Sequence, residues 1–264
     1  MVLVGTPRSA AATGPKHVRA AISYRRDIGN ELWVVRVRPE VPIPFVPGQY
    51  ATLAVRDGDR MIERPYSMVS APHEEELEFF LERVDSGALT PQLYDVPEGG
   101  EVWIRPRAKG LFLRGLSGFD APRMLVATVT GIAPFLSFIR HMGMLAAKGE
   151  DSVEDAQPLL VLHGASNSLD LVYQEEMEHW AATLPNLAYV PTVSRPWAEP
   201  SWTGEVGRVE DIARKYLDQA GLEHAAVEIF LCGNPQMVDK MRQLMVRAMV
   251  PDSHVKEEQY WRED

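Results

Sequence analysis

The sequence predicts two domains in succession, an N-terminal antiparallel β-barrel followed by an α/β domain with a doubly wound parallel sheet. From Val18 to about Trp103, short segments of alternating polar and apolar residues are separated by Pro and Gly, which is typical of antiparallel strands. After Pro122, apolar runs alternate with longer helical patterns, which indicates a parallel sheet covered on both faces. The 264 residues, of which 45% are hydrophobic, are enough for two modest cores.

The first domain is expected to consist of short strands with one short helix. We predict strands at 32–37, 49–55, 77–81 and 101–104, and a further strand-like segment at 66–70. Thr90 and Pro91 are a favourable N-cap and first helical residue for a helix at 91–94. We place this domain at 17–117, after a flexible tail at 1–16.

In the second domain, predicted at 118–264, each helix follows a strand. The expected strands are 124–127, 159–162, 188–193 and 227–231, and the expected helices are 132–147, 170–183, 209–219 and 235–249. Repeated right-handed crossovers of this kind build an open sheet whose ligand crevice lies beyond the carboxyl ends of the strands. Motifs that directly follow strands are therefore candidates for a binding site.

The composition argues against several classes of function. Cys232 is the only cysteine, so this sequence can form no intrachain disulfide, cysteine zinc site or four-cysteine cluster, and no histidine pattern suggests a metal. The net charge of −10 argues against nucleic acid as a partner. The sequence has no run of about 18 apolar residues and no secretory signal, so we expect a cytoplasmic protein without membrane contact. We also expect a monomer.

The first motif that carries chemistry is Arg64-Pro65-Tyr66-Ser67. An arginine can neutralise a pyrophosphate, a tyrosine can lie flat on an isoalloxazine ring, and a serine hydroxyl can hydrogen-bond its redox-active nitrogen. An edge strand with an exposed arginine is the alternative interpretation. Further on, Gly87 and Thr90 lie in a turn that leads into the short helix, whose free N–H groups attract phosphate, although an ordinary capped turn would have the same sequence.

Two more motifs follow predicted strands of the second domain. The small-residue turn 128–134 opens a helix, where a dinucleotide pyrophosphate is expected to rest, but it lacks the Gly-x-Gly-x-x-Gly pattern, and a generic turn is the alternative. The segment 232–238 also opens a helix, and its Cys232 either touches a nicotinamide ring edge or is a buried thiol. Helical spacing of the methionines favours a core position for them. They are Met237, Met241 and Met245.

In this order, the motifs resemble those of the ferredoxin–NADP reductase superfamily. The matching segments are Phe45-x-Pro47-Gly48-Gln49-Tyr50, Arg64-Pro65-Tyr66-Ser67, Thr130-Gly131-Ile132-Ala133-Pro134 and Cys232-Gly233-Asn234-Pro235-Gln236-Met237-Val238. The resemblance extends from about Val18 to Trp261, and the ordered set is more specific than any single motif. It implies that the barrel binds FAD and that the α/β domain binds a nicotinamide dinucleotide.

The resemblance also implies roles for individual residues. Tyr66 would stack on the flavin, Ser67 would contact the flavin nitrogen that accepts hydride, and Cys232 would lie near the nicotinamide, which makes these three the candidate catalytic residues. The implied FAD-binding residues are Arg64, Pro65, Tyr66, Ser67, Gly87, Thr90 and Trp261. The implied NADP-binding residues are Thr130, Gly131, Ser194, Arg195, Arg208, Cys232 and Met237. The tail 258–261 resembles the aromatic tail of bacterial members, which packs at the flavin. Because three residues follow Trp261 here, it is undecided which aromatic of the tail does so.

Three positions depart from the family pattern. Val129 stands where many members have Gly, and its side chain could keep a pyrophosphate at a distance. Ser194 and Arg195 suit the 2′-phosphate of NADPH. However, Ser166 and Glu205 stand where related bacterial reductases often have Arg. We expect NADPH rather than NADH as the coenzyme.

The predicted function is FAD-dependent electron transfer between NADPH and a one-electron carrier. Hydride transfer needs two stacked rings rather than a general base. Because the sequence has no cluster of its own, the carrier is expected to be a separate protein, ferredoxin or flavodoxin. A basic cluster could dock such an acidic partner. It consists of Arg105, Arg107, Lys109 and Arg114. The alternatives are an NADH-dependent reductase of an oxygenase, a flavin-based diaphorase or ferric reductase, and a flavin subunit of a larger complex.

Overall fold

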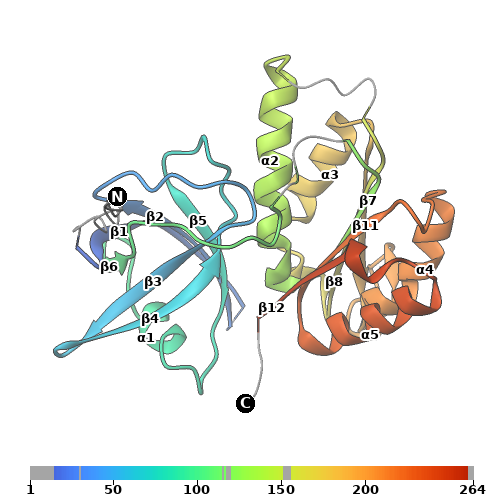
Figure 1. Cartoon of the computed structure of the whole chain (residues 1–264). Coiled ribbons are helices and arrows are strands. Elements are labelled where there is room, and N and C mark those ends of the chain that lie inside the picture. The colour runs from blue at the N-terminus through green and yellow to red at the C-terminus, as the bar shows by residue number, and fades with distance from the viewer. Residues whose placement is uncertain (1–14, 30, 115, 117–119, 151–155, 261–264) are drawn as a thin grey trace, which may run out of the picture.

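The computed structural model describes residues 15–29, 31–114, 116, 120–150 and 156–260. Within them, an antiparallel six-stranded sheet from the first part of the chain lies beside a parallel six-stranded sheet from the second part (Figure 1). The predicted boundary at 117/118 falls outside the described residues, and so do residues 1–14 of the predicted tail. The domain limits therefore stay predictions.

The antiparallel sheet closes into the predicted barrel. Its strands are β1 (Val18–Ile28), β2 (Leu32–Pro39), β3 (Tyr50–Asp57), β4 (Arg60–Ser67), β5 (Leu77–Glu82) and β6 (Glu101–Ile104), in the order β4-β3-β6-β1-β2-β5. Inward side chains such as Ile22, Trp33 and Phe79 are at most 1% exposed. The two edges of the sheet meet just after β4, where the Val69 amide donates to the Glu78 carbonyl at 2.8 Å.

One strand of the barrel lies earlier than predicted. The segment 66–70 is not a strand of its own, because β4 ends at Ser67 as the second half of a hairpin with β3. The charged residues 56–63 form the tip of this hairpin, where most side chains are exposed or only partly buried, so the sequence there lacks the alternation of a half-buried strand. The Arg64–Ser67 motif therefore lies at the end of a strand rather than at its start.

The parallel sheet is doubly wound, as predicted. Its strands are β7 (Arg123–Thr128), β8 (Leu159–Ala165), β9 (Leu187–Val193), β10 (Glu205–Val206), β11 (Glu228–Gly233) and β12 (Val255–Gln259), in the order β10-β9-β8-β7-β11-β12. The chain enters at β7, moves outward to β10 and returns to β11 on the other side of β7. The direction of winding therefore reverses between β7 and β11, which is where ligands of such sheets bind.

Helices cover both faces of the parallel sheet (Figure 1). They are α2 (Ala133–Ala147), α3 (Gln174–Thr183), α4 (Val209–Gln219) and α5 (Pro235–Arg247). The α2 and α3 helices share a core with the barrel, whereas α4 and α5 pack on the other face. The bounds of α4 are as predicted. The helix predicted at 170–183 begins only at Gln174, after a separate 3₁₀ turn, η2 (Ser168–Asp170). The last helix ends before Met249, which has a left-handed φ of 60°.

The α2 helix lies between the two sheets. Among the described residues, one helical stretch, Val129–Ala147, has the length and hydropathy of a membrane span, and 67% of its 18-residue apolar window is buried inside the protein. Its Phe135 packs against Phe112, which follows the barrel, with ring centroids 5.8 Å apart. Val69 of the barrel belongs to the same apolar cluster. Packing on both sides accounts for the apolar character of α2.

Polar contacts also join α2 to the barrel. Arg140 of α2 donates to Glu78 of β5 at 3.0 Å and to Glu176 of α3 at 2.7 Å. The Ser137 hydroxyl donates to the Ser70 carbonyl at 2.7 Å. These contacts fix how the two sheets face each other, and with that the geometry of the site between them.

Candidate active site

Two pockets meet where the barrel faces the carboxyl edge of the parallel sheet. The first, which we call the barrel pocket, has a volume of about 450 Å³, and the second, the sheet pocket, has about 980 Å³. Glu82, Val84, Thr130 and Tyr260 line both. A ligand in one pocket can therefore present one end to a ligand in the other.

The motif at the end of β4 forms one wall of the barrel pocket. Arg64 and Pro65 are exposed there, Tyr66 is half-buried and Ser67 is buried. Burial raises the pKa of the Tyr66 hydroxyl well above its usual range, and Arg64 opposes this effect only in part, so the phenol stays neutral. A neutral aromatic ring beside a buried hydroxyl and an exposed guanidinium is the chemistry expected for an isoalloxazine ring and its pyrophosphate.

Gly87 and Thr90 also line the barrel pocket, but not in the predicted way. The helix α1 (Thr90–Tyr94) begins at Thr90, and its N-cap is Leu89, which provides no side-chain cap. The prediction that Thr90 is the N-cap is wrong. Its hydroxyl instead accepts from the Val84 amide at 3.0 Å and so ties the turn together. A Cβ on Gly87 would lie 2.9 Å from that hydroxyl, so the turn needs a glycine.

Glu258, which the sequence did not indicate as a site residue, reaches Ser67 from β12. The Ser67 hydroxyl donates to Glu258 Oε1 at 2.7 Å, and both residues line the barrel pocket. Burial raises the pKa of the Glu258 carboxyl, although the bond from Ser67 opposes the effect. The buried Ser67 and the half-buried Glu258 therefore form a pair that can hold a proton next to the ring wall of the pocket.

Tyr260 stands at the junction of the two pockets. It lines both of them, and its amide donates to the Gly233 carbonyl at 3.2 Å. Burial raises the pKa of its hydroxyl well above the usual range. Within the tail 258–261, Tyr260 is therefore the aromatic that the structure places at the site. The predicted FAD contact of Trp261 lies outside the described residues.

The turns that follow β7 and β11 touch each other at the point where the winding reverses. A Cβ on Gly131 would lie 2.3 Å from the Cys232 carbonyl oxygen, so no larger residue fits. The Asn234 amide donates to Thr128 Oγ1 at 2.8 Å, and the Asn234 side chain caps α5 by accepting from the Gln236 amide at 2.8 Å. Two helices thus begin side by side at the sheet pocket, which favours an anionic group there.

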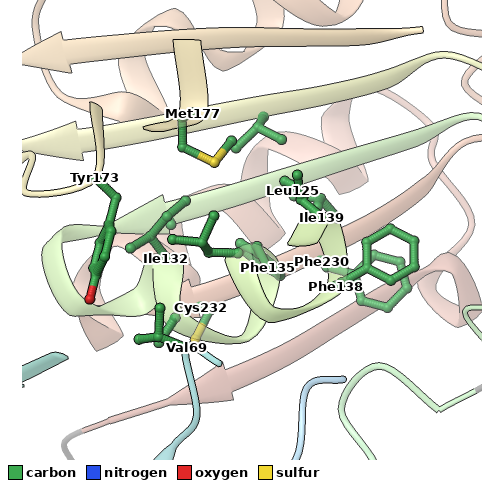
Figure 2. Packing of buried hydrophobic residues seen from close by; sticks show 14 of the residues in the cluster. Val69, Leu125, Ile132, Phe135, Phe138, Ile139, Tyr173, Met177, Phe230 and Cys232 are labelled. Atoms are coloured by element: carbon green, nitrogen blue, oxygen red, sulfur yellow. The ribbon is translucent and has the colours of Figure 1, made fainter. Parts of the chain in front are cut away.

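The Cys232 side chain lies behind this surface. It is fully buried in the apolar cluster that α2 and Val69 help to form, as Figure 2 shows, and it lines neither pocket. Burial raises the pKa of its thiol well above the usual value, so it stays protonated. The prediction that this thiol reaches a nicotinamide edge is therefore not met in this structure, and the alternative, a buried thiol, is what the structure contains. Gly131, which the resemblance assigned to NADP binding, is buried as well and does not line the sheet pocket.

The remaining predicted residues come together in the sheet pocket. They are Thr130, Ser194, Arg195, Arg208 and Met237. The Ser194 amide donates to the Ala165 carbonyl at 3.0 Å, which anchors the loop that carries Arg195. Met237 is only 3% exposed, so it also serves the core. Trp197 lines the same pocket with 76% of its surface exposed, and sequence reasoning gave no sign of it.

Glu205, expected to repel a phosphate, is paired away from the pocket. Its carboxylate accepts from Lys215 Nζ at 2.8 Å and from the Tyr216 hydroxyl, and it does not line the sheet pocket. Lys215 and Tyr216 hold the pKa of Glu205 below its usual value. The lysine charge therefore offsets the Glu205 carboxylate. Arg195 and Arg208 supply cations to the pocket, although Arg208 also lies 3.9 Å from Glu210, which lines the pocket too.

Comparisons with known proteins agree with this architecture. Residues 125–243 match a family described as an oxidoreductase NAD-binding domain. The chain is 32% identical over 221 residues to ferredoxin–NADP reductase B of Sorangium cellulosum, over 82% of this chain and 85% of that one. It is 31% identical over 199 residues to the flavodoxin/ferredoxin–NADP reductase of Escherichia coli, over 74% and 77% of the two chains. A ferredoxin NADP⁺ reductase from Neisseria gonorrhoeae, solved with bound FAD and NADP, has a TM-score of 0.78 at 21% identity, over 94% of this chain and all of that one.

The last comparison supports the fold, and the two bacterial relatives support the family. Both relatives exceed 30% identity, and this chain covers more than two thirds of each of them. The barrel, the doubly wound sheet and the adjoining pockets are the arrangement that the sequence motifs implied. The chain therefore belongs to the ferredoxin–NADP reductase superfamily.

Proposed function

We propose that this protein carries out FAD-dependent electron transfer between NADPH and a one-electron carrier protein, ferredoxin or flavodoxin. The observation that carries the proposal is the junction of the two pockets at Thr130 and Tyr260. Tyr66 and Ser67 line one pocket near this junction, and the two helix beginnings line the other. Two rings bound in the two pockets would meet there, as direct hydride transfer requires.

The residues of the barrel pocket fit FAD. Tyr66 offers an aromatic face, Ser67 a buried hydroxyl, and Arg64 an exposed cation for a phosphate. The tight turn of Gly87 and Thr90 allows close approach of a second phosphate to the backbone. When bound, FAD supplies the exchange between a two-electron hydride donor and a one-electron acceptor.

The residues of the sheet pocket fit the phosphates of NADPH. Thr130 lies at the turn after β7, where a pyrophosphate is favoured, and Ser194, Arg195 and Arg208 offer a hydroxyl and two cations for a 2′-phosphate.

Absorbance spectroscopy of the purified protein tests the proposed function directly. We expect a flavin spectrum that bleaches on stepwise addition of NADPH. Protein that is colourless and cannot be reconstituted with FAD would refute it.

Coenzyme preference gives a more specific prediction. We expect Arg195→Ala to raise the KM for NADPH about 10- to 100-fold, the loss of one charge-assisted hydrogen bond to a phosphate, with kcat nearly unchanged. The KM for NADH, which lacks the 2′-phosphate, should not change. Steady-state rates with both coenzymes provide the measurement, and Arg247→Ala, an exposed arginine at the end of α5, is the control. Equal losses with NADPH and NADH would assign Arg195 to another part of the coenzyme.

The basic cluster is smaller than the sequence implied. Arg105 donates to Glu63 at 2.9 Å, so its charge is already compensated. Arg107, Lys109 and Arg114 are exposed. The backbone of Lys109 pairs with that of Tyr50, which lines the barrel pocket. We propose that these three cations, which we call the basic patch, dock an acidic carrier beside the flavin.

The docking proposal predicts an effect that depends on salt. The double variant Arg107→Glu/Lys109→Glu is expected to reduce kcat/KM for the carrier about 10-fold or more at low ionic strength, because a patch of one sign steers association. The loss should shrink as salt is added, and reduction of a small uncharged acceptor should be unaffected. Lys148→Glu/Arg247→Glu makes the same charge change at the carboxyl ends of α2 and α5, away from the pockets, and serves as the control. Equal losses in both variants would contradict a local patch.

We also propose that the protein works as a cytoplasmic monomer without membrane contact. The acidic composition, with a net charge of −10, and the burial of the apolar stretch Val129–Ala147 inside the protein support this part of the proposal. Sedimentation of the purified protein at micromolar concentration, together with fractionation of cells, is the test. A dimer or recovery in the membrane fraction would overturn it.

A further inference from the structure

The first residue after β7 has a backbone conformation that is unfavourable for its side chain. Val129 opens the 3₁₀ turn η1 (Val129–Ile132) with φ 44°, in the left-handed region. Branching at Cβ makes this region costly for valine, whereas glycine adopts it freely. Val129 and the next residue, Thr130, both line the sheet pocket. Such strain persists only where the surrounding structure imposes it.

A buried histidine from the neighbouring strand holds this residue. The Nε2 atom of His163 in β8 lies 2.9 Å from the Val129 carbonyl oxygen, and its Nδ1 atom lies 3.2 Å from the Tyr189 hydroxyl of β9. The His163 side chain is fully buried. A carbonyl oxygen can only accept, so Nε2 carries the proton and donates, and Nδ1 accepts from Tyr189.

The arrangement satisfies every polar atom of the imidazole without a charge. Burial lowers the pKa of His163 to about 4, although the bond to Val129 opposes the effect, so the ring is neutral near pH 7. Burial also raises the pKa of Tyr189 well above its usual range, so its hydroxyl remains a donor. A chain of two hydrogen bonds therefore runs from β9 through β8 to the turn after β7.

We propose that His163 is a positioning residue for the coenzyme, which holds the Val129 carbonyl and so keeps the strained turn, with Thr130, in the shape that binds the dinucleotide. The proposal rests on the function proposed for the sheet pocket. It explains how a valine is tolerated at this position. The hydrogen bond from His163 offsets the strain of the left-handed backbone, which a glycine would not have. His163 acts through the backbone of Val129 and does not line the pocket itself.

A double-mutant cycle tests the proposal. His163→Phe fills a similar volume but removes the donor, and Val129→Gly removes the strain. We expect His163→Phe to weaken binding of NADP⁺ to the flavin-loaded protein about 10-fold, the usual loss for one hydrogen bond. In the Val129→Gly background the same substitution should change the dissociation constant less than about 2-fold. Difference absorbance spectra of the flavin measure both constants.

Two controls separate this role from a general loss of stability. The matched control is His224, whose Nδ1 atom lies 2.9 Å from the Ala248 carbonyl oxygen and which lines neither pocket. His224→Phe should leave the dissociation constant unchanged. His163→Gln retains an amide donor and should recover part of the affinity that His163→Phe loses. A drop in the urea midpoint of His163→Phe without a change in NADP⁺ affinity would overturn the proposal.

The experiment also distinguishes this inference from the proposed function. If the wild-type protein binds FAD but neither NADP⁺ nor NADPH, the proposed function fails. The urea midpoints of the four proteins of the cycle still report whether His163 holds the turn, because Val129→Gly should then offset most of the midpoint shift that His163→Phe causes. Equal shifts in both backgrounds would show that the histidine and the strained valine are independent, which also overturns the inference.

Discussion

Replacing Arg140 with methionine is expected to lower the free energy of unfolding by about 3 kcal/mol at neutral pH, because the buried Glu78 carboxylate loses its buried cationic partner and keeps only the half-exposed Arg36 as a charged one. The Arg140 side chain is 13% exposed, and that of its partner Glu78 is 3% exposed. Arg140 also pairs with Glu176 at 2.7 Å and with Glu74 at 3.4 Å. Methionine keeps much of the side-chain volume, so the expected loss comes from the charge rather than from a cavity. Urea unfolding followed by circular dichroism provides the measurement.

The effect of Arg140→Met should depend on pH through Glu78. Burial raises the pKa of this carboxyl, but Arg140 and Arg36 together with the Tyr173 hydroxyl outweigh burial, and the net pKa is lowered. A carboxyl with a lowered pKa contributes stability above its unfolded pKa and loses it as the pH falls through the folded pKa. The difference between wild type and Arg140→Met should therefore be full at pH 7 and shrink below about pH 4.5.

An exposed ion pair provides the matched control for this prediction. Arg214 and Asp218 pair at 2.8 Å one turn apart on α4, with about half of each side chain exposed. Arg214→Met removes the same charge with the same side chain, but water and salt screen the pair, so little change is expected. Similar losses for both variants, or a loss for Arg140→Met that persists in acid, would rule out a buried charge cluster as the main link between the two sheets.

The parts of the fold that the sequence predicted well are those with one periodic pattern. The helix at 209–219 has a polar and an apolar face, and its bounds match α4. Strand β12 was missed because Val255–Gln259 is a charged edge strand with no buried residue, and it is recognisable only by its pairing with β11. Pairing between distant segments does not leave a local pattern, so a single sequence cannot reveal it.

For the candidate site, too, the sequence predicted residues that belong to a local pattern and missed those that long-range contacts bring in. Short motifs predicted Arg64–Ser67, Ser194 and Arg195, because the required chemistry is contained within a few neighbouring residues. Glu258 is 191 positions from Ser67, and only the position of β12 next to β11 brings the two together. Burial also changed the interpretation of Cys232, whose direction behind the turn depends on the packing of α2. Contacts across the fold therefore decide which of the plausible residues reach the pocket.

Replacing Ser67 with alanine is expected to have the largest effect on catalysis. Each turnover in the direction of the carrier must release a proton from the site, and the Ser67 hydroxyl, 2.7 Å from Glu258 Oε1, can pass it to that carboxylate. Loss of a positioned proton-transfer group typically costs about 100-fold or more. We therefore expect Ser67→Ala to slow reduction of the carrier about 100-fold while FAD remains bound. Stopped-flow measurement of flavin reoxidation isolates this step.

Two further variants decide whether Ser67 acts through Glu258. Burial raises the pKa of the Glu258 carboxyl, so it becomes a proton acceptor at a higher pH than an exposed carboxyl does. The wild-type rate of reoxidation should rise as the pH increases through this raised pKa of Glu258, and the rise should be absent in Glu258→Gln. Ser70→Ala removes another buried hydroxyl, three residues further on and outside both pockets, and should keep the wild-type rate and pH profile. If Ser67→Ala and Ser70→Ala slow the reaction equally, the effect is one of packing, and the hydroxyl of Ser67 has no part in moving the proton.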